Sequence, residues 1–513
     1  MKNTKNCMAK PIMIQGTMSG AGKSLLVAGI CRCLYEDGYQ VAPFKSQNMA
    51  LNSFVTEDGL EMGRAQVMQA EAAGRKPVVE MNPILLKPTS DTGSQVIVNG
   101  KAVGTMPAKE YFSYKKSLLP QIKNAYETLA EQVDVIVIEG AGSPAEINLK
   151  QDDIVNMGMA KLADAPVLLV GDIDRGGVFA QLYGTVALLE EEERKRIKGL
   201  IINKFRGDLS ILTPGIRMLE EKCGIPVFGV VPYLPIELEA EDSLSNQLQE
   251  NANKEKTKPI QIAVIQLKRI SNFTDFDVFS RMEEVSLVYV KHPSQLAHPD
   301  AILLPGTKNT ADDLLILRQN GLEAAILKEA AKGTPIFGIC GGYQMLGEEI
   351  SDESNMESGK TVRGMGLLPG KTAFLTTKTR TQVHGVFENN EGFFSCFQGL
   401  SFHGYEIHMG ETTFFEKISP LVQKETNEGS SIPDGCVLEN VCGTYVHGIF
   451  DEEGVAEAFV LALAKKKGIT LKKNEMECYA AYKERQFSLL GEGIRKSGLM
   501  KHVYRLLEEQ HES

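Results

Sequence analysis

The sequence predicts two α/β domains in one chain, the first a doubly wound parallel sheet with a phosphate-binding loop. Three observations lead to this prediction. Short apolar segments alternate with helical ones in two separate series, and a glycine-rich loop follows the first apolar segment. The 513 residues also exceed what one hydrophobic core usually holds.

The first half of the chain contains six apolar segments that we expect to be strands of the parallel sheet. Strands covered by helices on both faces have nearly continuous apolar sequences. These segments are residues 12–14, 41–44, 135–138, 167–170, 200–202 and 227–230, and helical segments such as residues 25–35 separate them. This alternation predicts a first domain over residues 1–249.

A polar, charged segment without apolar periodicity, residues 250–259, is expected to be the interdomain linker. A second α/β series follows it, and from about residue 367 to 450 the sequence becomes glycine-punctuated and β-rich. Helical periodicity returns at Glu453. We therefore assign residues 260–513 to a second domain that ends in helices. The apolar segments of its α/β series are residues 262–265, 288–290, 301–304 and 334–339.

Composition argues against a nucleic-acid-binding, a disulfide-rich or a membrane-spanning protein. The chain has 55 basic and 66 acidic side chains, a net charge of −11, which gives no electrostatic reason to bind nucleic acid. Its nine cysteines form no CxxC pair or regular ladder, so we expect reduced thiols in a cytoplasmic protein. The apolar run near the N-terminus is broken by Gln15 and Gly16, and no apolar stretch is long enough to span a membrane.

The loop GTMSGAGKS, residues 16–24, follows the first predicted strand and opens a helix. In this context backbone amides of a loop containing Gly22 can surround phosphate oxygens, while Lys23 reaches the outer phosphates and Ser24 holds Mg²⁺. The loop is one residue longer than the common GxxxxGK[ST] form. The alternative is a tight strand-to-helix connection without a ligand.

Three more residues follow predicted strands at the carboxyl edge of the same sheet, where open α/β folds bind ligands. Glu139 ends the strand at residues 135–138 and is our second Mg²⁺ ligand. Lys45 adds a cation, and Asn203 an amide able to pair with a purine edge. The alternatives are a solvated surface lysine for Lys45 and an ordinary loop residue for Asn203.

Residues 11–235 resemble the dethiobiotin synthetase type of ATP-dependent carboxylate-activating domain. The resemblance rests on the long loop GTMSGAGKS, on Phe44-Lys45, on the segment EGAG that begins at Glu139, and on Asn203-Lys204. It implies transfer of the γ-phosphoryl group of ATP to a carboxylate-type oxygen, with ATP and Mg²⁺ bound at this loop.

A second site centres on Cys340, which ends the strand predicted just before it and is followed by Gly341 and Gly342. This pattern is typical of a nucleophile elbow, where a thiol stands at a helix N-terminus. His447, 107 positions later, follows another predicted strand and is our candidate base. The amide of Gly306 or of Thr307, after a third strand, could complete an oxyanion hole with the Gly341 amide. A buried structural cysteine and histidine are the alternative.

The Cys-x-Gly-x-Gln pattern of residues 340–344 and the distant histidine resemble the class I glutamine amidotransferase domain over about residues 260–450. This resemblance implies that Cys340 attacks the side-chain amide of glutamine, His447 moves the proton and Gln344 contacts the substrate. One departure is clear: most members have Glu two residues after the histidine, where this chain has Ile449. Asp451 and Glu406 are weak candidates for orienting His447.

The domain order, the missing Glu, and the segments KSQNMALNS from Lys45 and GYEIHMG from Gly404 resemble the cobyric acid synthase family over nearly the whole chain. The resemblance implies amidation of the b, d, e and g carboxylates of adenosylcobyrinic acid a,c-diamide, through acyl phosphates and ammonia released from glutamine. It also implies that Gln47, Asn48 and Asn52 face the corrinoid. A solvated polar loop is the alternative.

Three rival functions remain open at this point. Cobyrinate a,c-diamide synthases share both halves and the chemistry but amidate other carboxylates. The CTP synthase type is also fed by glutamine and ATP, but it normally retains the Glu that Ile449 replaces. A ParA- or MinD-like ATPase switch has a similar nucleotide loop and would leave Cys340 and His447 without a role. The sequence leaves the oligomeric state open.

Overall fold

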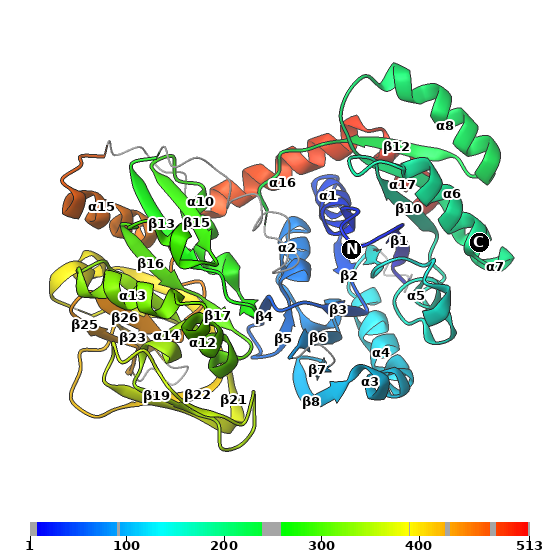
Figure 1. Ribbon diagram of the computed structural model, residues 1–513. Helices are drawn as coiled ribbons and strands as arrows, with labels where there is room; N and C mark the ends of the chain where they lie inside the picture. The colour runs from blue at the N-terminus through cyan, green and yellow to red at the C-terminus, as the bar shows by residue number, and fades with distance from the viewer. Residues whose placement is uncertain are drawn as a thin grey trace, which may run out of the picture.

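The computed structural model describes residues 8–89, 93–238, 258–388, 390–425, 431–471 and 479–510. It forms two bodies that lie against each other (Figure 1). All but the last two residues of the segment expected to link the domains, residues 250–259, lie outside the described residues.

The first domain is built on a six-stranded parallel sheet of order β12-β11-β10-β1-β9-β2. All six strands predicted from the sequence belong to it, because each carries the unbroken apolar run that burial on both faces requires. Their bounds are β1 Lys10–Gly16, β2 Val41–Phe44, β9 Val135–Glu139, β10 Val167–Asp172, β11 Ile197–Phe205 and β12 Val227–Pro232.

Helices cover both faces of this sheet and separate its hydrophobic core into two clusters. The predicted helix after the phosphate loop is α1, Lys23–Glu36. The other α-helices between β2 and β12 are α2 Arg64–Ala72, α3 Ala108–Tyr114, α4 Leu119–Ala130, α5 Met157–Leu162, α6 Val178–Leu188, α7 Glu191–Arg196 and α8 Leu209–Cys223.

A small second sheet, which the sequence patterns did not reveal, is inserted between β2 and α3. Its order is β3-β6-β7-β8, with β3 Gln47–Met49, β6 Ile84–Pro88, β7 Gly93–Val98 and β8 Lys101–Pro107. A hairpin of β4, Ser53–Val55, and β5, Glu61–Gly63, accompanies it. Figure 1 shows β3, β4 and β5 in the region between the two domains, so this insertion belongs to their interface.

The second domain has its own six-stranded sheet of order β15-β13-β16-β18-β26-β25, parallel except at β25. The four apolar segments predicted there are β13 Ile260–Ile265, β15 Val285–Val290, β16 Ala301–Leu304 and β18 Ile336–Ile339; β25 Cys436–Leu438 and β26 Val441–Thr444 complete it. Its helices are α10 Asp277–Ser280, α11 Pro293–Leu296, α12 Thr310–Gln319, α13 Leu322–Ala331 and α14 Gly341–Leu346.

The expected β-rich region is a sheet dominated by the long antiparallel hairpin of β21, Gly370–Phe387, and β22, Ser401–Phe414, and antiparallel except where β19 pairs with β21. The short strands β14 Ile270–Ser271 and β17 Gly306–Thr307 pair beside the main sheet. The other strands of the region are β19 Glu349–Ser351, β20 Thr361–Arg363, β23 Val422–Glu425 and β24 Ser431–Asp434.

The C-terminal helices divide between the domains, unlike the boundary expected from the sequence. Helix α15, Val455–Lys467, packs in the core of the second domain, whereas α16, Tyr479–Lys496, and α17, Leu499–Glu509, belong to the core of the first. Figure 1 shows α16 returning across the molecule to lie beside α1. Amphipathic periodicity predicts a buried face but does not say which domain buries it.

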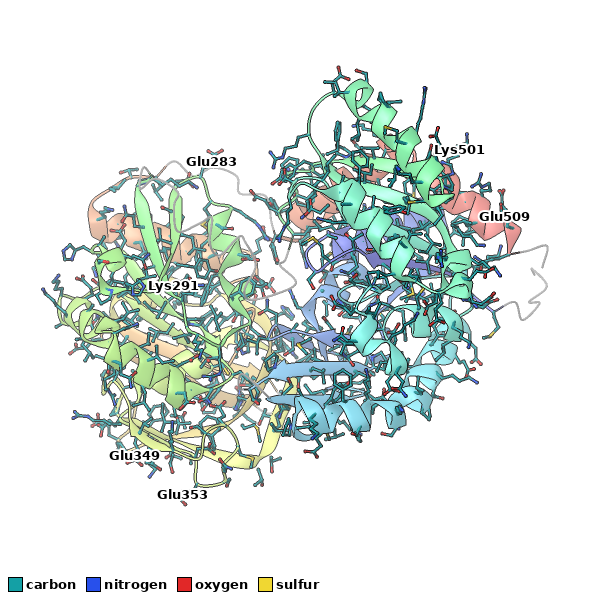
Figure 2. The ribbon with its side chains drawn as sticks, turned by 45° about the vertical axis from the view of Figure 1, so that its right-hand side comes forward. Glu283, Lys291, Glu349, Glu353, Lys501 and Glu509 are labelled. Atoms are coloured by element: carbon teal, nitrogen blue, oxygen red, sulfur yellow. The ribbon has the colours of Figure 1, made fainter. Side chains whose placement is uncertain are left out.

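Within the described part of the chain, no helix is long and apolar enough to cross a membrane. Charged side chains such as Glu283, Lys291, Glu349 and Lys501 lie on the outside of both bodies (Figure 2).

The packing of α16 on α1 predicts that Ile494→Ala destabilises the first domain. Ile494 is fully buried, and a methyl group added at Gly29 of α1 would lie 2.6 Å from it. The cavity should cost about 2–5 kcal/mol of unfolding free energy. Hydrogen exchange should then accelerate in α1 and β1.

The matched control is Leu461→Ala on α15, because the Leu461 side chain is 39% exposed. Its unfolding free energy should fall by no more than about 1 kcal/mol. Faster exchange in β13 and β16 of the Ile494 variant, with α1 unchanged, would contradict the assignment of α16 to the first domain.

Candidate active sites

The phosphate loop has the geometry expected of an anion cradle. Gly20 and Gly22 have φ angles of +73° and +89°, which only glycine adopts readily, and α1 begins directly after them at Lys23. The Lys23 ammonium donates to the carbonyls of Met18, at 3.1 Å, and Gly142, at 3.2 Å. Lys23 thus joins the loop after β1 to the loop after β9, at the edge where ligands of open α/β sheets bind.

Asn203 braces this loop. Its amide nitrogen donates to the carbonyl of Ala21 at 2.9 Å, and a methyl group at Gly22 would lie 2.3 Å from the same nitrogen. The close approach explains why glycine is needed at position 22. The structure therefore brings Asn203 to the predicted nucleotide site, in contact with the loop backbone.

Glu139 lies at the centre of a buried polar cluster beside Lys23. Its Oε1 atom accepts hydrogen bonds from Ser24 Oγ at 3.0 Å and from Lys45 Nζ at 2.8 Å, and its Oε2 atom accepts one from Gln69. The three residues predicted from separate parts of the sequence, Ser24, Lys45 and Glu139, thus meet at one point. Gln69 was missed, because it lies inside α2 with no motif around it.

The donor set of this cluster suits Mg²⁺. A hydroxyl and a carboxylate oxygen lie 3.0 Å apart at the end of the phosphate loop, and small hard cations take oxygen ligands together with phosphate oxygens. The paired Lys45 balances the carboxylate charge in the buried site.

A second carboxylate at the same edge, Asp172, was also missed. It ends β10, is fully buried, and accepts a hydrogen bond from Lys204 Nζ at 2.8 Å. Lys204 has a φ of +59° and also donates to the carbonyl of Gly20. The signal was present, since a carboxylate that ends a buried strand is the same pattern that identified Glu139.

A mainly apolar cavity of about 610 Å³ adjoins the loop after β9, and Gly142 lines it. Gln47 also lines it and accepts a hydrogen bond from Tyr111 at 2.6 Å. Asn48 and Asn52, expected beside Gln47 at the substrate, are not among the lining residues: Asn48 donates to Gln66, and both amide atoms of Asn52 are buried without a partner among the described residues.

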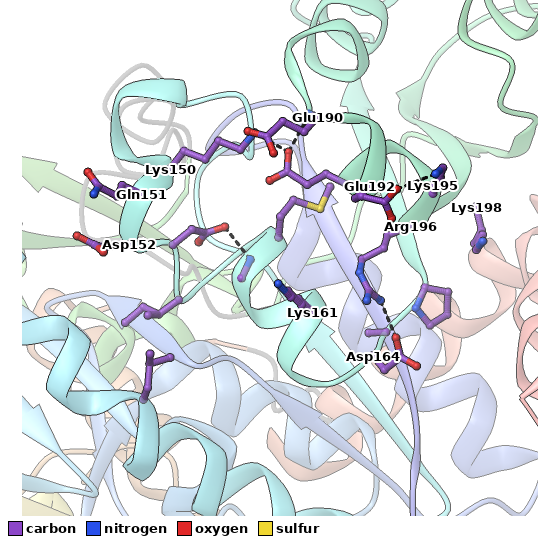
Figure 3. A pocket seen from close by; sticks show the side chains of 18 of the residues that line it. Lys150, Gln151, Asp152, Lys161, Asp164, Glu190, Glu192, Lys195, Arg196 and Lys198 are labelled. Atoms are coloured by element: carbon purple, nitrogen blue, oxygen red, sulfur yellow. Dashed lines mark hydrogen bonds and ion pairs between the residues drawn. The ribbon is translucent and has the colours of Figure 1, made fainter.

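Another cavity, about 1150 Å³, reaches the opposite edge of the sheet. Ala165 and Pro166, just before β10, line it, and so does Lys198 near the start of β11. Figure 3 shows its charged side chains pairing with one another, as in Arg196 with Asp164. None of the predicted site residues lines this cavity, in keeping with ligand binding at the carboxyl ends of parallel strands.

Cys340 stands at a strained turn between β18 and α14. Its φ and ψ angles are +51° and −108°, an unfavourable conformation for a residue with a side chain. A methyl group on Gly342 would lie 2.1 Å from the carbonyl of Leu304, so the chain can turn here only with glycine. The strand, thiol and helix follow one another as the predicted nucleophile elbow requires.

His447 lies beside Cys340 and is held by a carboxylate that the sequence did not reveal. The Nδ1 atom of His447 donates to Oδ2 of Asp275 at 2.7 Å, and the backbone amide of Gly448 donates to Oδ1 at 2.9 Å. Burial lowers the pKa of His447, but the charge and hydrogen bond of Asp275, together with Cys340, raise it to about 10. An imidazolium at this position stabilises negative charge on the sulfur.

Asp275 was missed because it precedes both Cys340 and His447 and lies in a short turn, Phe273–Phe276. No spacing rule joins it to His447, since only the fold brings them together. Ile449, at the usual position of the third residue, is fully buried in the apolar core, and Glu406 pairs with Lys424.

The predicted oxyanion and glutamine contacts surround the thiol. Methyl groups added at Gly306 and Gly341 would lie 3.0 Å from Cε1 of His447 and from the Thr307 amide nitrogen, respectively. Gln344 accepts a hydrogen bond from Thr310 and, with Cys340 and His447, lines a cavity of about 40 Å³. The arrangement can perform nucleophilic attack on an amide. The backbone near Gly341 would then face the oxyanion that develops.

The contact between Asp275 and His447 predicts the effect of Asp275→Asn. Loss of the carboxylate charge should lower the pKa of His447 from about 10 towards its ordinary value. Glutamine hydrolysis should fall by about 10³-fold, and its rate should decline as the pH rises above about 7, because the imidazolium is then lost. The measurement is kcat for glutamine hydrolysis over a pH range of about 6 to 10.

Glu406→Gln is the control, because Glu406 pairs with Lys424 instead of holding His447. If the Asp275→Asn variant has the wild-type kcat and the same dependence of kcat on pH at alkaline pH, Asp275 does not position the histidine.

Comparison with known proteins identifies both halves. Residues 12–245 match the CobQ/CobB/MinD/ParA nucleotide binding domain, and residues 261–455 match the CobB/CobQ-like glutamine amidotransferase domain. The chain is 57% identical to the cobyric acid synthase of Lachnoclostridium phytofermentans, over 98% of this chain and 100% of the relative. It is 55% identical to that of Ruminiclostridium cellulolyticum, over 98% of each, and 51% identical to that of Alkaliphilus metalliredigens, over 97% and 99%. The chain therefore belongs to the cobyric acid synthase family.

Proposed function

We propose that this chain converts adenosylcobyrinic acid a,c-diamide to adenosylcobyric acid in cobalamin biosynthesis, by amidating the b, d, e and g carboxylates with ATP and glutamine. The observation that carries the proposal is that one chain, similar over nearly its whole length to cobyric acid synthases, contains both a phosphate cradle and a thiol site. The reduced cysteines of the described residues agree with a cytoplasmic enzyme.

The thiol site releases ammonia from glutamine. Cys340 attacks the side-chain amide carbon, and His447 passes a proton to the leaving nitrogen, so that ammonia departs and a thioester remains on the sulfur. Water then hydrolyses the thioester with His447 as the base. Asp275 keeps the Nδ1 atom of His447 protonated, which leaves Nε2 for these transfers.

The phosphate cradle activates the acceptor carboxylate. The loop amides, Lys23 and Ser24 would hold the phosphates of ATP, and Ser24 and Glu139 would hold Mg²⁺, which neutralises charge on the phosphates. ATP converts a carboxylate, a poor electrophile, into an acyl phosphate. Ammonia displaces the phosphate and leaves an amide.

The cavity of about 610 Å³ next to Gly142 is our candidate for the corrinoid site. Its mainly apolar wall, with Met49, Leu86 and Tyr111, suits the face of a large macrocycle, whereas Gln47 offers a polar contact to its rim. Its contact with the loop that also holds Lys23 supports this assignment, since the acceptor carboxylate must reach the γ-phosphate. We propose that Asn48 and Asn52 shape the same loop from behind.

Mass spectrometry of cobyrinic acid a,c-diamide incubated with the protein, MgATP and glutamine tests this function directly. Four successive conversions of carboxylate to amide are expected. Cobyrinic acid is tested as a second substrate. If it is instead amidated only at the a and c positions, the chain is a cobyrinate a,c-diamide synthase. With neither substrate changed, the proposal is wrong.

Cys340→Ala should abolish amidation driven by glutamine, because no other thiol lies at the elbow, while amidation driven by ammonium salt survives. The product of each reaction is measured by the same mass spectrometry. Loss of both reactions in a folded variant would contradict two separate sites.

Lys23→Ala should remove amidation from either nitrogen source, since the cation that faces the phosphates is lost, while hydrolysis of glutamine by Cys340 remains detectable. The matched control is Lys76→Met, an exposed lysine of the same domain that pairs with Glu57. A Lys23 variant that amidates at the wild-type rate would disprove the assignment of the phosphate cradle.

A further inference from the structure

The small cavity at Cys340 has a wall from the first domain. Lys87, on β6, lines it together with Lys308 and Lys378 of the second domain and with Cys340 and Gln344. Side chains alternate along β6, so the neighbours Leu86 and Pro88 line the apolar cavity on the opposite face. One strand of the inserted sheet therefore borders both the thiol site and the candidate corrinoid site.

Lys87 is held firmly in this wall. Its Nζ atom donates to Ser53 Oγ and to Glu61 Oε1, both at 2.9 Å. The other oxygen of Glu61 accepts a hydrogen bond from Lys378 at 2.6 Å, which joins the two domains. Both lysines and Glu61 are almost completely buried, with side-chain exposures of 5% for Lys87, 12% for Lys378 and 0% for Glu61.

The cavity has an excess of positive charge. Lys87, Lys308 and Lys378 face it, whereas the carboxylates that the described residues bring close are Glu357, in the lining, and Glu61, which pairs with Lys87 and Lys378. Among the described residues, Lys308 has no carboxylate within ion-pair distance. Burial lowers the pKa of Lys378 to about 8 and also lowers that of Lys308, and the charge of Lys87 acts in the same direction on both. A buried excess of one sign is costly unless an anion accompanies it.

The substrate of this site carries the missing anion. Glutamine presents its side-chain amide to Cys340 and Gln344, and its α-carboxylate lies at the far end of the same short molecule. Glu357, which lines the cavity and whose pKa burial raises to about 7, offers the complementary charge for the α-ammonium group. The cavity, about 40 Å³, accommodates water or ammonia, so glutamine has to displace part of this wall.

We propose that Lys87, Lys308 and Lys378 form the subsite for the α-carboxylate of glutamine, so that the first domain completes the glutamine site of the second. The inference rests on the glutaminase activity proposed above. It implies that the amidotransferase domain alone binds glutamine poorly, because one of its cations comes from the strand that also borders the corrinoid cavity. Access of glutamine is thereby tied to the position of the first domain.

The test compares glutamine with glutaminamide, in which a neutral carboxamide replaces the α-carboxylate. Lys87→Met keeps the apolar stem and removes the charge. It should raise KM for glutamine hydrolysis by about tenfold or more, as expected for loss of a hydrogen bond to a charged group. The kcat/KM for glutaminamide should stay within about threefold of wild type. Lys87→Arg should recover most of the affinity for glutamine, and Lys76→Met should behave as wild type.

A merely structural role of Lys87 gives a different result, since both substrates then lose kcat/KM by the same factor. Unchanged KM for glutamine in the Lys87→Met variant also overturns the inference. If thermal unfolding shows that this variant does not fold, Lys308→Met takes its place, because Lys308 makes no ion pair with a described residue. A wild-type chain without glutaminase activity overturns both this inference and the proposed function, whereas the other outcomes affect only the inference.

Discussion

Both active sites depend on one geometric constraint, which is that parallel strands deliver their following residues to a single edge of the sheet. Glu139 and Asp172 end strands of the first sheet, and the phosphate loop with Lys23 follows a third. In the second sheet Cys340 follows β18, and His447 comes shortly after the neighbouring strand β26. Because the strands are buried on both faces, their positions are fixed by packing, and the polar groups at their ends are positioned with them.

This constraint explains how much the sequence could predict. All ten apolar segments assigned to the two parallel sheets are strands of those sheets, because burial on both faces leaves an unmistakable apolar run. Residues that follow such runs, including Ser24, Lys45, Cys340 and His447, were found for the same reason. Asp275 and Gln69 were not, because one lies in a short turn and the other inside a helix. Their roles depend on tertiary contacts that have no local pattern.

The interface between the domains was equally hidden from the sequence. The strands β3, β4 and β5 have only three residues each and are partly polar, so they resemble a loop. The structure shows that the Ser53 carbonyl accepts hydrogen bonds from Asn272 at 3.0 Å and from the Tyr405 hydroxyl at 3.1 Å. Tyr405 in turn stacks on His447, with 5.4 Å between ring centroids. A segment of the first domain thus contacts Tyr405, the side chain that stacks on His447.

The packing of α16 within the first domain and the ion pairs that reach across the interface differ in what they contribute. The apolar packing of α16 on α1 stabilises the fold, since it removes Phe487, Leu490 and Ile494 from water. The buried pairs of Glu61 with Lys87 and Lys378 contribute little by the same measure, because desolvation of the charges offsets their attraction. Well-packed apolar side chains would hold the interface at least as well. The charges are therefore best explained by the cavity at Cys340, which they face. An enzyme that passes ammonia from one domain to the other gains when residues of both domains build the site that releases it.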